Sequence, residues 1–179
     1  MPTTARDLTL EHFRRIDGHA DVWAVFRDAG ALAAAVVAAL VEPFRNERIT
    51  AVCGIESRGF LLGGAAAVEL GVGFVPVRKG EGLLPGDTVT RRASPDYRDL
   101  RHTLRLQRSS LGPGDRVLLI DDWIETGSQA AAVRSMAEEC GADWAGCGVV
   151  VDQLAAARRD ALGALHGLVA ARDLPPYGS

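Results

Sequence analysis

Lysine is almost absent from this chain of 179 residues, because Lys79 is its only lysine and all the other permanently charged cations are arginines. A surplus of positive charge is absent as well, since 20 lysines and arginines face 23 acidic residues and the formal net charge at pH 7 is -3. Such a chain as a whole attracts neither a nucleic-acid backbone nor an anionic lipid surface. We therefore expect no nucleic-acid partner and no membrane partner, and any polyanion has to be bound at a local site.

Cysteine is also scarce. Cys53, Cys140 and Cys147 form no CxxC pair, and their odd number cannot form a closed set of disulfides, so we expect them to be small core residues. The four histidines are scattered without metal-ligand spacing to a cysteine, which argues against a zinc site.

Long hydrophobic runs are missing too. No stretch approaches the roughly 20 apolar residues of a membrane-spanning helix, and residues 1–17 lack the apolar core of a signal peptide. The sequence therefore predicts a cytoplasmic protein. A hydrophobic content of 47% suits one globular domain over residues 1–179.

Hydrophobic periodicity alternates between the helical and the extended pattern along the chain. Helices are predicted at 28–44, 60–70, 128–139 and 153–162. Strands are predicted at 49–55, 73–77, 101–107, 117–120, 146–151 and 166–171. This order predicts an α/β fold with a central, mostly parallel sheet flanked by helices. The stretch from Arg78 to about Arg101 is so rich in charge, glycine and proline that we expect it to pack loosely.

Residues 117–133, VLLIDDWIETGSQAAAV, place two acids where a buried strand is expected to end and a small-residue turn before the next helix. Ligands of parallel sheets bind at this edge. The turn Thr126-Gly127-Ser128 offers backbone N–H groups and the positive end of a helix dipole to a phosphate. Asp121 and Asp122 can accept hydrogen bonds from a sugar diol and hold a hydrated Mg²⁺ nearby. The pattern indicates a phosphorylated ribose, although an Asp-Asp pair alone is also compatible with a strand end and a helix cap.

Other common nucleotide and hydrolase motifs are absent. The sequence contains no GxGxxG, no Gly-Lys-Ser/Thr of a Walker loop and no GxSxG elbow. A Rossmann dinucleotide site, a P-loop and a Ser-His-Asp hydrolase are therefore not indicated.

The string VLLIDDWIETG resembles the phosphoribosyl-pyrophosphate signature of type I phosphoribosyltransferases. GIESRGFLLGGAAAVELGVGFVPVRKGEGLLPG (54–86) resembles the corresponding segment of the adenine phosphoribosyltransferase family, and VWAVFRD (22–28) resembles its base-binding motif. Three motifs in the expected order over roughly 100 residues are far more specific than any one of them. The resemblance implies the type I phosphoribosyltransferase fold with a flexible hood loop at about residues 80–100.

The resemblance also implies roles for individual residues. The residues implied in catalysis are Asp121, Asp122, which would hold the ribose hydroxyls, and Asp96. The residues implied to bind the 5′-phosphate are Glu125, Thr126, Gly127, Ser128 and Gln129. Those implied to bind pyrophosphate are Ser57, Arg58, Gly59, Arg78 and Lys79. Those implied to bind the base are Val25, Phe26 and Arg27. Mg²⁺ would be held through the substrate and water.

Some positions depart from the family pattern. Asp96 stands where the family's hood carries a glutamate, and Glu125 stands where the family usually has alanine. Because aspartate is one methylene shorter, its reach to a base changes. An acid beside a phosphate turn repels the phosphate unless it points away or pairs with arginine.

By this resemblance, the expected function is transfer of the 5-phosphoribosyl group from 5-phosphoribosyl 1-pyrophosphate to adenine or a related purine, with release of pyrophosphate. The departures leave open another acceptor, such as xanthine, hypoxanthine or a specialised heterocycle. A regulator that binds the donor without turnover is the third hypothesis, although the residues before VFRD are too few for a winged helix-turn-helix domain. By the same resemblance, the partners are small-molecule substrates and a second copy of the chain in a homodimer.

Overall fold

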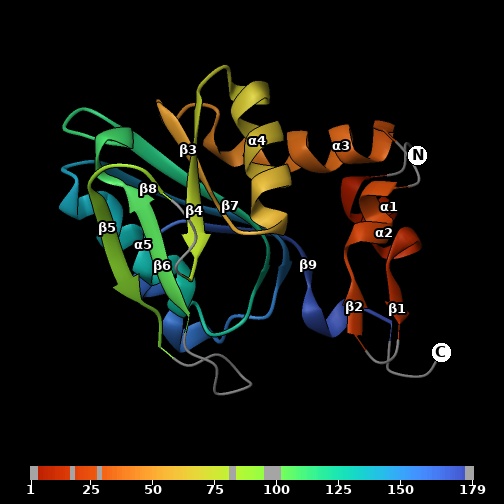
Figure 1. The fold of residues 1–179 in the computed structure, drawn as a ribbon. Helices are drawn as coiled ribbons and strands as arrows, with labels where there is room; N and C mark the ends of the chain where they lie inside the picture. The colour runs from red at the N-terminus through yellow and green to blue at the C-terminus, as the bar shows by residue number, and fades with distance from the viewer. Residues whose placement is uncertain (1–3, 17–18, 28–29, 81–83, 95–101, 176–179) are drawn as a thin grey trace.

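The structure, a computed structural model of the chain, describes residues 4–16, 19–27, 30–80, 84–94 and 102–175. A seven-stranded sheet in the order β5-β6-β4-β3-β7-β8-β9 forms its centre (Figure 1). β4, β3, β7, β8 and β9 run parallel, whereas β6 is antiparallel to β4 and β5. The strands are β3 (Ala51–Ile55), β4 (Gly73–Lys79), β5 (Thr88–Arg92), β6 (Thr103–Gln107), β7 (Arg116–Ile124), β8 (Asp143–Asp152) and β9 (Leu165–Ala170). The predicted fold class is confirmed.

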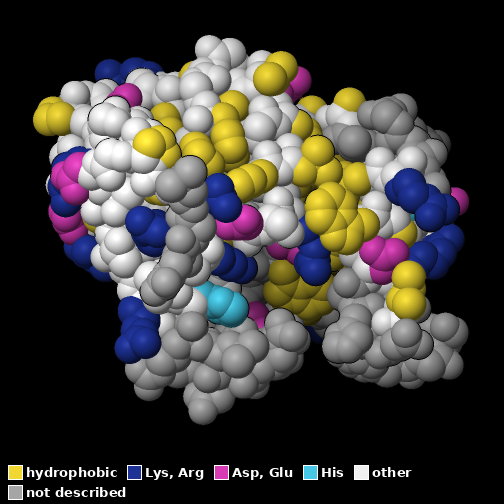
Figure 2. All heavy atoms as spheres, viewed as in Figure 1, with side chains coloured by type: hydrophobic (Ala, Val, Ile, Leu, Met, Phe, Trp, Pro, Cys, Tyr) yellow, Lys and Arg dark blue, Asp and Glu magenta, His cyan; other side chains and the backbone are white. Residues whose placement is uncertain are grey.

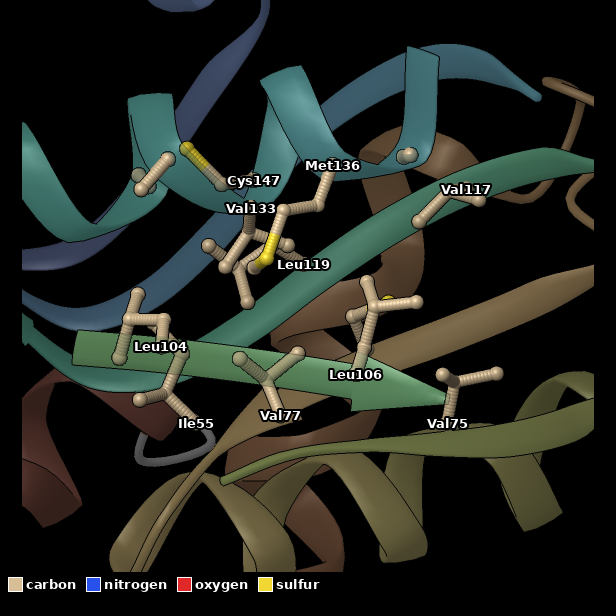
Figure 3. Packing of buried hydrophobic residues seen from close by; sticks show 14 of the residues in the cluster. Ile55, Val75, Val77, Leu104, Leu106, Val117, Leu119, Val133, Met136 and Cys147 are labelled. Carbon is tan, nitrogen blue, oxygen red and sulfur yellow. The ribbon is translucent and has the colours of Figure 1, made fainter. Parts of the chain in front are cut away.

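Helices cover both faces of the sheet. α3 (Gly30–Val41) and α4 (Arg58–Leu70) pack on one face, and α5 (Ser128–Glu139) packs on the other (Figure 1). In β7, Leu119 lies in the cluster that contains Met136 of α5 (Figure 3), whereas Leu118 lies in the cluster on the α3 and α4 side. Burial on both faces explains the uninterrupted aliphatic run of this strand.

The N-terminal residues form a small unit beside α3 and β9. It consists of α1 (Ala5–His12), α2 (Trp23–Arg27) and the antiparallel pair β1 (Arg14–Ile16) and β2 (His19–Asp21). Thr4 and Asp7 cap α1 reciprocally, and an Arg6 Nη2 to Asp173 Oδ2 bond of 2.9 Å ties this helix to the far end of the chain. The remaining turns are the 3₁₀ helices η1 (Glu42–Phe44), η2 (Arg108–Ser110), η3 (Ala156–Arg158), η4 (Asp160–Leu162) and η5 (Ala171–Asp173).

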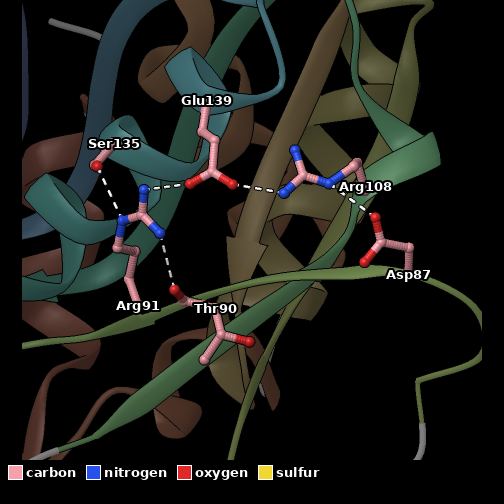
Figure 4. A network of polar contacts seen from close by, with 6 residues as sticks. All are labelled: Asp87, Thr90, Arg91, Arg108, Ser135 and Glu139. Atoms are coloured by element: carbon pink, nitrogen blue, oxygen red, sulfur yellow. Dashed lines mark hydrogen bonds and ion pairs between the residues drawn. The ribbon is translucent and has the colours of Figure 1, made fainter.

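Part of the stretch that was expected to pack loosely is a strand, so that expectation is wrong for β5. Val89 is 1% exposed in the α5-side core, and β5 pairs with β6 along its whole length. Figure 4 shows Glu139 of α5 between Arg91 and Arg108, and it pairs with both. Arg108 Nη2 lies 2.5 Å from Glu139 Oε1. Local composition missed this strand because a long-range contact with α5 stabilises it.

The helix predicted at 153–162 is also wrong, because the segment forms only η3 and η4. Arg159 pairs with Asp152, and Leu154 and Leu162 are buried in the core on the α5 side. These tertiary contacts outweigh the helical propensity of the alanine-rich sequence.

The predicted core role of cysteine is confirmed for Cys53 and Cys147, which are buried free thiols, while Cys140 is half-buried. Burial raises the pKa of Cys53 and of Cys147 to about 12. None of the helices that the structure describes combines the length and the apolar character of a membrane span.

The start of α4 lies directly against β3, and glycine makes this contact possible. A Cβ added to Gly54 would lie 2.1 Å from the backbone carbonyl oxygen of Gly59. That oxygen belongs to the backbone and cannot rotate away as a side chain could. Gly54 therefore sets how closely the helix approaches the sheet at its carboxyl edge.

We expect Gly54→Ala to lower the free energy of unfolding by at least about 2 kcal/mol, because overpacking has to push α4 off β3. Gly73→Ala is the matched control, since a Cβ on this strand glycine would meet no atom within 4 Å. The control should stay within about 0.5 kcal/mol of the wild type in urea unfolding. Equal effects of the two substitutions would contradict the close approach of α4.

Candidate active site

The strands β3 and β7 are neighbours at their start and part before they end. Ala51–Cys53 pair with Val117–Leu119, whereas β3 continues with β4 to Ile55 and β7 continues with β8 to Ile124. β4 is the next strand of the sheet beyond β3, whereas β8 and β9 follow beyond β7 in the opposite direction. Such a switch in strand order creates a crevice at the carboxyl edge of a parallel sheet, where ligands bind.

The two neighbouring acids lie on β7 inside this region. We expected Asp121 and Asp122 to end the strand, and this is wrong, because Asp121 pairs with Val149 and the ladder with β8 continues to Ile124. β8 supplies the hydrogen bonds that β3 no longer provides. The acids are therefore held by regular backbone on one side and face the gap left by β3 on the other.

The alternation of β7 breaks at these two acids. Leu118 and Ile120 pack on the α3 and α4 side, and Trp123 packs on the same side, although a period of two would place it opposite. The strand therefore changes its facing at Asp121 and Asp122. This local turn of the backbone brings two consecutive carboxylates toward one region, whereas an ideal strand would point them to opposite faces.

Arg58, the first residue of α4, forms an ion pair with Asp122 across the gap. The Asp122 side chain is 13% exposed and the Arg58 side chain is 40% exposed. A cation is unfavourable at the positive end of a helix dipole, and the Asp122 carboxylate offsets this conflict. Gly59 follows with no side chain, and a Cβ there would lie 2.9 Å from Asp121 Oδ1.

The Asp121 carboxyl is in the less favourable environment of the two acids. Burial raises its pKa well above the ordinary value, the charge of Asp122 raises it further, and the nearby Lys79 ammonium lowers it. The backbone N–H of Asp122 donates to Asp121 Oδ1 at 2.9 Å. The influence of Lys79 also shows that the end of β4 lies close to these acids.

A tight turn joins β7 to α5. Gly127 has φ 74° and ψ 0°, a left-handed conformation suited to glycine, and the side chains of Leu154 and Leu162 pack around it. Gly127 is the N-cap and has no side chain to cap α5, while the Ser128 N–H donates to Thr126 Oγ1 at 3.3 Å. The N–H groups of its first turn have no partner within the helix, a feature that suits an anion.

Hydroxyl groups and one arginine organise the same turn. Thr126 Oγ1 donates to Ser128 Oγ at 3.1 Å, and Ser128 Oγ donates to the Ser94 carbonyl at 3.1 Å. Arg158 Nη1 donates to the Thr126 carbonyl at 3.0 Å. Glu125 and Gln129 are half-buried at either end of the turn.

A second charged group lies where β3 and β4 end side by side. Glu56 Oε2 accepts hydrogen bonds from Arg78 Nε at 2.9 Å and from the Lys79 backbone N–H at 3.0 Å. The Lys79 N–H is the largest cause of a lowered pKa at Glu56, and Arg78 contributes as well. The peptide bond between Glu56 and Ser57 is cis. Figure 2 shows charged side chains of both signs in the middle of the molecular face that it draws, beside hydrophobic side chains.

The chain is also similar to proteins of a known family. Residues 23–167 match the family model of the phosphoribosyl transferase domain. The chain belongs to this family. It is 44% identical over 147 residues to an adenine phosphoribosyltransferase of Methylococcus capsulatus, covering 82% of each chain. An adenine phosphoribosyltransferase of Dinoroseobacter shibae is 37% identical over 155 residues, covering 83% of this chain and 85% of that protein.

Solved structures of phosphoribosyltransferases have the same fold. The adenine phosphoribosyltransferase of Rhodothermus marinus matches with a TM-score of 0.81 at 33% identity, covering 93% of this chain and 98% of that chain. The Giardia lamblia enzyme, solved in complex with 9-deazaadenine, matches with a TM-score of 0.81 at 30% identity, covering 93% and 97%. The family resemblance noted in the sequence is confirmed.

The three residues expected to bind the base differ in how deeply they are buried. Val25 has no exposed surface and lies in the core. Phe26 is half-buried against that core, and Arg27 is exposed at the end of α2. Asp96 lies outside the described residues.

Two further residues belong to the site: Glu56, which opens the segment Glu56–Gly59 that resembles the family's pyrophosphate loop, and Trp123, which the sequence did not single out. Glu56 joins the ends of β3 and β4, and Trp123 places a half-buried indole directly after the acids, where its Nε1 donates to Gln153 Oε1 at 2.9 Å. The position of Trp123 next to the acids was the available signal. The contacts of Glu56 could not be predicted from the local pattern, because its partners lie more than 20 residues away in sequence.

No group of three or more His, Cys, Asp or Glu side chains in the described ranges is arranged to hold a metal ion. The donors at the site are two carboxylates, and Mg²⁺ characteristically binds through one or two carboxylates together with substrate phosphates and water. The residues therefore fit a metal that arrives with a phosphorylated substrate.

We expect Asp121→Asn to raise the melting temperature of the ligand-free protein at pH 7. The raised pKa of Asp121 means that the folded protein holds more protons than the unfolded chain, so wild-type stability falls as the pH rises through that window. The amide removes this cost, and the gain should shrink as the pH falls to about 4 and below, where the wild-type carboxyl becomes protonated in the unfolded chain as well. A lower melting temperature of the variant at pH 7 would contradict this electrostatic account.

Proposed function

We propose that the protein transfers the 5-phosphoribosyl group from 5-phosphoribosyl 1-pyrophosphate to adenine and releases pyrophosphate. The observation that carries the proposal is the arrangement at the carboxyl edge of the sheet. Twin acids on β7 lie between an anion-binding turn and a group of cations on α4 and β4. One sugar with a phosphate on one side and a diphosphate on the other matches this order of charges.

Each part of the donor has a counterpart in the site. Asp121 and Asp122 accept hydrogen bonds from the ribose hydroxyls. The 5′-phosphate binds to the turn formed by Glu125, Thr126, Gly127, Ser128 and Gln129. The pyrophosphate binds to the loop and strand end that carry Ser57, Arg58, Gly59, Arg78 and Lys79. When the donor binds, Arg58 leaves Asp122 and pairs with the diphosphate. Asp122 then accepts hydrogen bonds from the sugar.

The chemistry requires no covalent nucleophile. A ring nitrogen of the base attacks the anomeric carbon, the bond to pyrophosphate breaks, the leaving group takes the electron pair, and the ring N–H proton of the base passes to the released pyrophosphate or to solvent. The protein holds the reactants in line and stabilises the negative charge that develops on pyrophosphate through Arg58, Arg78 and Lys79. Mg²⁺ bound to the donor supplies further charge neutralisation.

Adenine is the acceptor that the relatives support, because they are adenine phosphoribosyltransferases and the Giardia lamblia structure contains 9-deazaadenine. Phe26 and Trp123 are half-buried aromatic residues on the same side of the sheet and offer flat apolar surface to a base. Asp96, as the counterpart of the family's hood glutamate, is the proposed acidic contact to the base. The substitutions at Asp96 and Glu125 favour a related purine as the second candidate acceptor.

The protein is proposed to act as one domain in the cytoplasm and as a homodimer. Leu61 and Val68 lie seven residues apart on α4, are 49% and 84% exposed, and offer an apolar face to a second copy. Sedimentation at micromolar concentration measures the oligomeric state, and a purely monomeric profile would remove the dimer from the proposal.

We expect the purified protein with Mg²⁺ and 5-phosphoribosyl 1-pyrophosphate to convert adenine to its nucleotide and release one pyrophosphate for each nucleotide formed. The measurement is a panel of adenine, hypoxanthine, xanthine and guanine with pyrophosphate detection, repeated with EDTA as the control for the metal. Turnover of another purine alone would support the second acceptor. Donor binding without turnover of any base would support the regulatory protein instead.

Asp122→Asn should weaken binding of ribose 5-phosphate by about 10- to 100-fold, since a hydrogen bond to a charged group contributes about 1.5–3 kcal/mol. Binding of pyrophosphate should stay equal or become tighter, because Arg58 loses its competing carboxylate. Titration calorimetry with the two ligands separates these effects. Asp152→Asn is the matched control, because Asp152 is 12% exposed and also pairs with an arginine at a strand end. Unchanged affinity of Asp122→Asn for ribose 5-phosphate would contradict the ribose assignment.

A further inference from the structure

Glu56 is an acidic residue at the place where the proposed function puts an anion. Its backbone N–H donates to the Val77 carbonyl at 2.9 Å, which keeps it against the end of β4. Its side chain is 32% exposed, and its Oε2 accepts from both Arg78 and the Lys79 backbone. By charge alone a carboxylate here opposes the binding of pyrophosphate, so its presence calls for a geometric explanation.

The register of the sheet supplies that explanation. Arg78 on β4 lies directly opposite Arg105 on β6, and like charges that face each other across a strand pair repel. Glu56 approaches Arg78 from the other neighbouring strand, β3. Its bond to Nε therefore holds the Arg78 guanidinium toward β3, which is the side where Arg58 begins α4.

The bond to Lys79 acts on the backbone. The Lys79 N–H donates to the same carboxylate oxygen, so one group fixes both the arginine side chain and the course of the chain at the end of β4. Lys79 lies close enough to influence the Asp121 carboxyl. The position of β4 at this point therefore determines how its two cations converge with Arg58 on one ligand.

We propose that Glu56 is a positioning residue for pyrophosphate, acting through Arg78 and the end of β4 without touching the ligand itself. This inference rests on the proposed function, since it assigns a further residue to the same site. The cations are long and mobile by nature, and an arginine held at Nε loses less freedom when its remaining nitrogens bind a diphosphate.

Glu56→Gln separates the geometric role from the charge, because the two predict opposite signs. Removal of a negative charge alone strengthens pyrophosphate binding. Loss of positioning weakens it, by about tenfold for one charged hydrogen bond, because a neutral amide oxygen holds the Arg78 guanidinium less strongly than a carboxylate does. Titration calorimetry with Mg²⁺ and inorganic pyrophosphate measures the sign. We expect weaker binding, and equal or tighter binding overturns the proposal.

Two further variants complete the design. Glu56→Asp keeps the charge and shortens the reach, so it should also weaken pyrophosphate, whereas wild-type affinity in this variant overturns the positioning role. Glu47→Gln is the matched control, since Glu47 also accepts from an arginine, Arg116 at 2.6 Å, but at the opposite end of the sheet. It should bind pyrophosphate like the wild type.

A double-mutant cycle tests whether Glu56 acts through Arg78. If it does, Glu56→Gln in an Arg78→Gln background costs markedly less than in the wild type. In steady-state assays the KM for the donor should rise about tenfold, while the KM for the base stays within twofold. Equal increases in both constants, or additive effects in the cycle, overturn the proposal. Failure of the wild type to bind pyrophosphate would instead contradict the proposed function, so the two failures are distinct.

Discussion

The parting of β3 and β7 is the constraint on which the rest of the site depends. The strands share hydrogen bonds only over Ala51–Cys53 and Val117–Leu119, and each then follows a different neighbour. Backbone groups beyond that point are available to loops and ligands. The start of α4 lies in this gap, because Gly54 and Gly59 have no side chains that would keep it away. The two acids face the same gap, because the alternation of β7 breaks at their position. The crevice is thus a consequence of strand order.

Charge is distributed so that the ligand-free site neutralises itself. Arg58 pairs with Asp122, and Arg78 pairs with Glu56. Both pairs are partly exposed, so they contribute little to stability by themselves. Their value lies in holding the charged side chains in place, with one pair between α4 and β7 and the other between the ends of β3 and β4. A substrate that has hydroxyls next to a diphosphate can exchange partners with the first pair while the second stays in place.

Sequence patterns captured what is local. The aliphatic run of β7, the acids and the glycine turn before α5 are continuous in the chain, and so the strand and the turn could be predicted. What failed depends on distant partners: β5 is ordered by Glu139, residues 153–162 are shaped by packing under Gly127, and Glu56 acquires its role from Arg78. Val25 matched a family motif, yet its neighbours bury it. Periodicity reports which face is apolar and carries no information about what covers it.

The most direct test of the central claim is a crystal structure with ribose 5-phosphate and pyrophosphate bound together. The account predicts the ester phosphate on the turn at residues 126–129, the sugar hydroxyls on Asp121 and Asp122, and Arg58 moved from Asp122 to the diphosphate. Glu56 should remain bonded to Arg78. Ligands bound elsewhere, with the pair of Arg58 and Asp122 intact, would contradict the account.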